Sequence, residues 1–169
     1  MAKSDSFYIR ATLDIGNDNL FHQGEIDLGA YVDALGKSVL RIHNIQVTYS
    51  DNTGRSSTLT ASGGTVAQWQ LTTQTQTDII LPSDKSLISS GRVHMNATVA
   101  PGLASEVTDV NDINLHEWKN GYLVAVDTIY LGGSASTNFA GDVYVSVVLE
   151  CTVETMTQAG AMALSLSQQ

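Results

Sequence analysis

The sequence predicts an all-β fold, namely an antiparallel two-sheet sandwich of the jelly-roll type with about eight strands. Several segments alternate apolar and polar residues with the period of two that a half-buried strand shows. Turn-forming Gly, Asn, Asp and Pro residues separate these segments. A regular alternation of helical and strand patterns, which a parallel α/β fold needs, is absent from the sequence.

Three strands are expected early in the chain. The first covers residues 7–14, where apolar and polar side chains alternate strictly. A second is expected over residues 24–28, although residues 26–35 could instead begin a short helix. In the third, Val39–Tyr49, the apolar residues change parity half-way. A β-bulge near His43–Asn44 would absorb the extra residue and let both sets face the core.

The middle of the chain is predicted to hold two further strands between polar segments. Residues 50–65 have little apolar content and are expected to form a long exposed loop or a flexible hairpin. Residues 67–72 and 92–99 alternate well and are predicted strands. Residues 103–120 are interpreted as a polar, acidic connection.

Two of the strongest strand patterns lie near the end of the chain, at residues 122–131 and 142–155, with Gly132–Ser136 as the hairpin loop between them. Six residues of the last strand are expected to share one face: Val143, Val145, Val147, Leu149, Cys151 and Val153. The strands are expected to form a single β-sandwich domain over residues 1–158.

The remaining residues, 159–169, are predicted to form a C-terminal tail or arm. They are small, apolar or uncharged, and could adopt a short helix or an extended conformation. Because uncharged apolar surface in water favours a partner, we expect the tail to act in assembly. Truncation from Ala159 onward is expected to leave a folded domain that assembles poorly.

The composition excludes several classes of protein. The net charge is −9, and the eight Lys and Arg residues are scattered singly, so direct nucleic-acid binding is not expected. Charged residues make up 15% of the chain, below the usual quarter, which suits permanent contacts between subunits. The start lacks the apolar core of a secretory signal, and no window is apolar enough to predict a membrane span.

Nothing in the sequence predicts an enzyme or a cofactor. The single cysteine, Cys151, lies between Leu149 and Val153 in an apolar pattern, so it is interpreted as a buried, inert thiol. No nucleophile elbow surrounds any serine, and no phosphate-binding glycine motif occurs. The pairs Gly63–Gly64 and Gly132–Gly133 are therefore interpreted as loop hinges.

No metal site is predicted either. The four histidines have no metal-ligand spacing: His22, His43, His94 and His116. The densest group of oxygen ligands consists of Asp109, Asn111, Asp112 and Asn114. An EF-hand needs an oxygen ligand and then glycine where Ile113 and Asn114 stand, so that motif fails. Calcium binding by this segment stays an alternative to a solvated loop.

Aromatic residues could line a sugar-binding face, but such residues are more often core or interface anchors. The candidates are Trp69, Trp118, Tyr49, Tyr122, Tyr130 and Tyr144. Asn96–Thr98 is a glycosylation sequon by letter, which we attribute to chance because no secretory signal accompanies it.

An all-β chain of this size, low in charge, rich in Thr, Ser and Gln, and ending in two long strands and an uncharged tail, resembles the single jelly-roll capsid proteins of tailless icosahedral viruses. The style is most similar to small major capsid proteins of membrane-containing double-stranded DNA viruses of archaea and bacteria. No diagnostic motif is matched. The basic arm found in many RNA-virus capsid proteins is also missing, because Met1–Ser6 offers only Lys3.

The resemblance implies a subunit that self-assembles through sandwich loops and termini into an icosahedral shell. It would be made in the host cytoplasm and reside in the virion. Its partners would be copies of itself, other capsid proteins and an underlying membrane, rather than nucleic acid. Two alternatives stay open: a carbohydrate-binding β-sandwich module that uses the tryptophans, and a phage tail or decoration protein.

Overall fold

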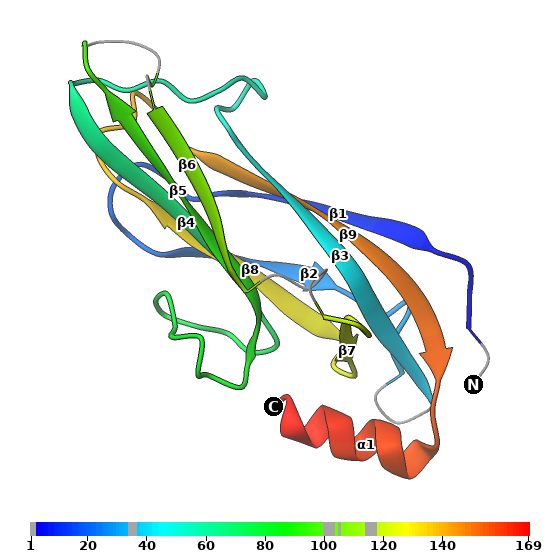
Figure 1. The fold of residues 1–169 in the computed structure, drawn as a ribbon. Helices are drawn as coiled ribbons and strands as arrows, with labels where there is room; N and C mark the ends of the chain where they lie inside the picture. Colours follow the sequence, from blue (N-terminus) through cyan, green and yellow to red (C-terminus); the bar gives the residue numbers. More distant parts are fainter. Residues whose placement is uncertain (1–2, 34–36, 100–103, 105, 114–117) are drawn as a thin grey trace.

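The computed structural model describes residues 3–33, 37–99, 104, 106–113 and 118–169. Two antiparallel sheets face each other, and one helix, α1, crosses one end of the sandwich (Figure 1). The described residues contain nine strands, where about eight were expected. The predicted all-β, two-sheet class is confirmed.

The sheets contain four and five strands. The four-stranded sheet has the order β1 (Phe7–Asp14), β9 (Tyr144–Thr155), β3 (Ser38–Ser50) and β7 (Tyr122–Val124). The five-stranded sheet has the order β2 (His22–Asp27), β8 (Thr128–Ala135), β4 (Gly63–Thr72), β5 (Leu87–Ala97) and β6 (Glu106–Ile113).

The pairing of the strands is that of a jelly roll with one strand added. When β6 is set aside, the first of eight strands pairs with the last (β1 with β9), the second with the seventh (β2 with β8), the third with the sixth (β3 with β7) and the fourth with the fifth (β4 with β5). A long hairpin rolled into two sheets produces this order. The additional strand β6 lies at a sheet edge beside β5 (Figure 1), and its residues 106–110 are exposed.

The predicted strands at residues 7–14 and 142–155 are confirmed, with most of their side-chain phase. Along β1, half-buried and exposed residues alternate without exception. In and just before β9, Val143, Val145, Val147, Leu149 and Cys151 are buried, as the alternation predicted. The sixth residue of the predicted face, Val153, is half-buried, and its neighbours Thr152 and Glu154 are buried. The register of β3 against β9 shifts between Ile42 and Asn44, which is the predicted bulge.

The core fills the space between the sheets. Its largest members include Trp69, Leu71 and Ile88 from the five-stranded sheet, Leu149 from the other sheet, and Phe139 from the connection between β8 and β9. Among the described residues, no helix combines the length and the apolar character that a bilayer crossing demands.

The prediction of one strand over residues 122–131 was wrong. The segment divides into β7 and β8, which belong to different sheets. The buried residues Ala125 and Val126 carry the chain from one sheet to the other. Their burial explains why the apolar pattern continued through a connection.

The interpretation of Gly132–Gly133 as a loop hinge was also wrong, because both residues lie inside β8. A Cβ atom on Gly132 would lie 2.5 Å from the Phe21 ring, and one on Gly133 would lie 2.6 Å from the carbonyl oxygen of Gln68. Glycine is needed here for close packing within and against the sheet. Likewise, Gly63–Gly64 begins β4 and does not form a hinge in a loop.

Two further expectations are corrected. The acidic segment 103–120 is not merely a connection, because residues 106–113 form β6. The segment 50–65 is not wholly exposed, since Ser57 and Leu59 are buried and Leu59 forms a β-bridge with Phe139. Residues 26–35 were expected to form either the end of a strand or the start of a short helix. The strand β2 continues to Asp27, and Leu35 lies outside the described residues.

Cys151 is buried in the core, and burial raises the pKa of its thiol to about 12. We therefore expect an alkylating reagent at neutral pH to label the native protein at least about a hundredfold more slowly than the unfolded protein. Mass spectrometry of timed reactions measures both rates. Rapid labelling of the native protein would contradict the inward phase assigned to β9.

Candidate functional site

The C-terminal residues form helix α1 (Gln158–Ser167), one of the two conformations that the sequence left open. Thr157 caps the helix, and its side chain accepts a hydrogen bond from the backbone N–H of Gly160 at 3.2 Å. No residue from Thr155 to Gln169 is charged. The helix therefore presents a neutral surface on a chain of net charge −9.

Small and polar residues attach α1 to the sandwich. Ala161 packs with Val39 and Ala125 in a small buried cluster. The side chain of Gln168, just after the helix, accepts a hydrogen bond from the Ala125 N–H at 2.9 Å and donates one to the Leu123 carbonyl oxygen at 2.7 Å. These contacts hold the end of α1 against the chain that connects β7 and β8.

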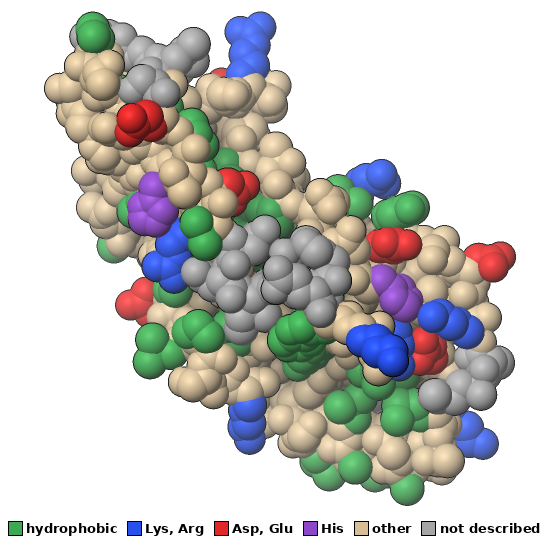
Figure 2. All heavy atoms as spheres, viewed as in Figure 1, with side chains coloured by type: hydrophobic (Ala, Val, Ile, Leu, Met, Phe, Trp, Pro, Cys, Tyr) green, Lys and Arg blue, Asp and Glu red, His purple; other side chains and the backbone are tan. Residues whose placement is uncertain are grey.

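The opposite side of α1, here called the outer face, consists of Ala159, Met162, Ala163 and Leu166. Met162 is 42% exposed and Leu166 is 70% exposed. Figure 2 shows hydrophobic side chains along the helix at the lower end of the molecule. A surface helix ordinarily buries its large apolar residues and exposes polar ones, whereas α1 buries Ala161 and Ser165 and leaves Met162 and Leu166 exposed. Such a face suits contact with another apolar surface.

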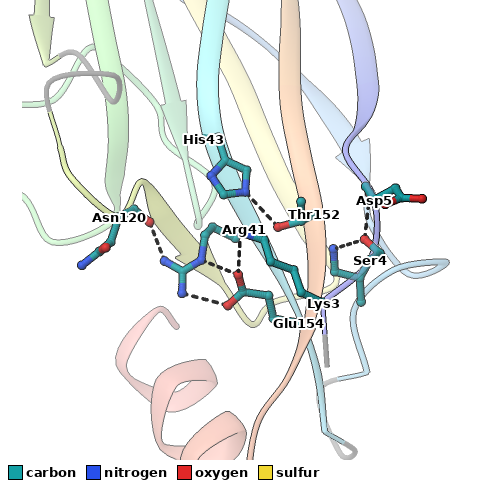
Figure 3. Close-up of polar contacts among 9 residues, drawn as sticks. Lys3, Ser4, Asp5, Arg41, His43, Asn120, Thr152 and Glu154 are labelled. Carbon is teal, nitrogen blue, oxygen red and sulfur yellow. Dashed lines mark hydrogen bonds and ion pairs between the residues drawn. The ribbon is translucent and has the colours of Figure 1, made fainter. Parts of the chain in front are cut away.

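A polar cluster lies beside α1, where β3, β9 and the N-terminal segment meet (Figure 3). Arg41 donates from Nε to Glu154 Oε1 at 2.7 Å and from Nη2 to Glu154 Oε2 at 2.8 Å. Its third nitrogen, Nη1, donates to the carbonyl oxygen of Asn120. Lys3 Nζ lies 3.6 Å from Glu154 Oε1. The cluster thus links β3, β9, the segment before β7 and the N-terminal segment.

The charges of this cluster affect each other. The hydrogen bonds from Arg41, with help from Lys3, hold the pKa of the buried Glu154 carboxyl below its ordinary value. Burial lowers the pKa of His43, and the positive charge of Lys3 lowers it further. His43 is therefore neutral at pH 7, and its Nε2 lies 2.8 Å from Thr152 Oγ1. Figure 3 shows His43 and Thr152 on neighbouring strands.

The other residues singled out in the sequence are scattered. His22, at the start of β2, has its Nε2 3.2 Å from Asp18 Oδ1. His94 is exposed on β5, and His116 lies outside the described residues. Asp109 is exposed on β6, so the segment proposed for calcium is largely a strand, and Asn114 lies outside the described residues. No group of three His, Cys, Asp or Glu side chains that could hold a metal is found in the part of the chain that the structure describes.

The aromatic residues do not form one platform. Trp69 is in the core at 2% exposure, and Tyr49 packs against the core. Trp118 is 46% exposed, and its ring centroid lies 6.4 Å from that of Tyr122. Asn96 lies on β5 at its pairing with β6. Among the described residues, Trp118 and Tyr122 are the only two of these candidate aromatic residues whose rings contact each other.

Comparison with solved structures finds the same fold in polyomavirus capsid proteins. VP1 of the trichodysplasia spinulosa-associated polyomavirus, solved with GM1 oligosaccharide, has a TM-score of 0.52 and 7% identity, covering 89% of this chain and 96% of that one. The unassembled VP1 pentamer of Merkel cell polyomavirus has a TM-score of 0.51 at 7% identity, with the same two coverages. Merkel cell polyomavirus VP1 with disialyllactose has a TM-score of 0.52.

At this level of identity the likeness establishes the fold. No protein-family model matches the chain, and no curated protein sequence matches it. The neighbours are jelly-roll proteins of tailless icosahedral viruses, so the predicted architecture is confirmed, as is the resemblance to that group at the level of structure.

Proposed function

We propose that this protein is a viral capsid subunit that associates with copies of itself. The observation that carries the proposal is the jelly-roll fold, whose likeness to polyomavirus VP1 covers 89% of this chain. The low fraction of charged residues, 15%, supports it, because permanent contacts between subunits disfavour charge at their centre. In this proposal the protein is structural and not an enzyme.

The outer face of α1 is the surface that we assign to contact between copies. Met162 and Leu166 expose apolar side chains there, and the helix contributes no charge that would repel another acidic copy. The tail that was expected to be an assembly arm is then an assembly helix docked on its own domain. The proposal extends to an icosahedral shell in the virion. In that shell the subunit would contact other capsid proteins and an underlying membrane.

The two alternative functions receive less support. A carbohydrate-binding module would use the tryptophans, but Trp69 is buried in the core. The glycans in the two polyomavirus complexes belong to those proteins, and a likeness at 7% identity does not carry glycan binding over to this chain. A phage tail or decoration protein was not expected to be a jelly roll, so the strand order counts against it.

Purified protein is expected to form oligomers well above the 18.0 kDa of a single chain, and electron microscopy is expected to show rings or shells. Size-exclusion chromatography with light scattering, across protein concentration and salt, measures the mass. A monomer under all these conditions would contradict the proposal. If such a monomer also bound an oligosaccharide library, the carbohydrate-binding alternative would replace it.

A further inference from the structure

The polar cluster beside α1 surrounds a pocket of about 410 Å³. It is lined by Lys3, Arg41, His43, Lys119, Asn120 and Glu154. These residues come from the N-terminal segment, β3, the segment before β7 and β9. The pocket is therefore formed only when the ends of the four-stranded sheet are assembled.

Contacts inside the pocket neutralise only part of its positive charge. Arg41 and Glu154 form a two-pronged ion pair, and Glu154 is also the partner of Lys3. Two cationic side chains thus share one carboxylate, and a third cation, Lys119, lines the same pocket. Lys119 forms no ion pair with any residue that the structure describes, and the Lys3 side chain is 51% exposed. The Lys119 ammonium group is consequently available at the pocket, and the half-exposed Lys3 ammonium group shares its one carboxylate with Arg41.

This concentration of positive charge contrasts with the rest of the protein. Three of the eight Lys and Arg residues line one pocket of a chain whose net charge is −9. Figure 2 shows basic, acidic and histidine side chains gathered close together above the helix.

We propose that this pocket binds an oxyanion, a carboxylate or phosphate group, held by the ammonium groups of Lys3 and Lys119. The Arg41–Glu154 pair forms the rigid wall, since all three guanidinium nitrogens already have partners. Neutral His43 and Asn120 add polar side chains without further charge. The oxyanion could be an acidic side chain of a second copy or free inorganic phosphate. The binding step itself does not depend on the capsid proposal.

Isothermal titration calorimetry with inorganic phosphate at fixed ionic strength tests the site. The double variant Lys3→Gln with Lys119→Gln is expected to bind phosphate at least about tenfold more weakly than the unchanged protein, because two charge-assisted contacts are lost. The matched control is Lys37→Gln with Arg55→Gln, which removes the same two charges outside the pocket. Its affinity is expected to stay within about twofold.

Absence of phosphate binding, or equal weakening in both double variants, would overturn the proposal. Lys119→Gln alone provides a second test that leaves the Lys3–Glu154 contact intact, and circular dichroism checks that each variant is folded. The oligomer mass, measured with and without phosphate, distinguishes a carboxylate of a second copy from free inorganic phosphate as the bound oxyanion. If phosphate dissociates oligomers, the pocket receives a carboxylate of a second copy; if phosphate binds without changing the mass, the pocket receives the free anion. Particle formation tests the capsid proposal separately.

Discussion

The double variant Met162→Gln with Leu166→Gln is expected to fold normally and to lose assembly. Both side chains lie on the outer face of α1, and glutamine has a helix propensity similar to that of leucine and methionine. Burying the two apolar side chains at a contact is worth about 2 to 3 kcal/mol after allowance for their partial burial in the single chain. Each contact between copies should therefore weaken roughly 30- to 140-fold.

The measurement is the oligomer mass by light scattering, with circular dichroism as the check on folding. Leu20→Gln with Val99→Gln is the matched control, because these residues are 63% and 77% exposed and lie in the β1–β2 connection and just after β5, at the end of the sandwich far from α1 (Figure 1). The control is expected to assemble like the unchanged protein. Equal assembly of the helix variant would remove α1 from the interface. Substitution is preferable to truncation, because deleting the tail also removes the Gln168 contacts to Leu123 and Ala125.

Glu154→Gln is expected to lower the free energy of unfolding by about 3 kcal/mol, because it leaves the partly buried Arg41 guanidinium without its charged partner. Urea denaturation of the two proteins measures the difference. Glu150→Gln on the same strand is the matched control, since Glu150 is more exposed and forms no ion pair with a described residue. Its effect should stay within about 0.5 kcal/mol. Equal losses in both variants would contradict the role of the pair.

The same variant gives a pH dependence with a definite sign. The pKa of Glu154 is lowered in the folded protein from its ordinary value of 4.5. Its stabilising contribution is therefore fully present above pH 4.5 and is lost as the pH falls through the folded pKa. The difference between the unchanged protein and Glu154→Gln should be largest near neutral pH and shrink in acid. A difference that grows in acid would contradict this assignment.

The alternation of apolar and polar residues was sufficient to predict strands that bury one face and expose the other. The alternation in β1 and β9 was readable because one side of each strand packs against the core. The bulge at His43–Asn44 was readable because a strand whose apolar residues change parity needs an inserted residue to keep both sets in the core. Cys151 followed from the same alternation.

Features that depend on pairing between distant segments could not be predicted in this way. β6 escaped prediction because its residues 106–110 are exposed, so no alternation marks it. The role of Gly132 becomes visible only when Phe21 is placed beside it. Arg41 and Glu154 are 113 positions apart, and only the register of β3 against β9 brings them together. In the sequence each is one charged residue on a predicted strand, and nothing local distinguishes Glu154 from Glu150.

The pairing of β1 with β9 also constrains how the protein can be made. Phe7 pairs with Cys151, so β1 leaves the ribosome well before its partner strand, which lies about 140 positions later in the chain. At about 5 to 20 residues per second, β1 waits on the order of 10 s for that partner. During this interval both of its backbone edges are open to other chains. The four-stranded sheet can therefore be completed only after β9 has been translated, and pairing of β1 with neighbouring nascent chains on the same message becomes a hazard for this fold.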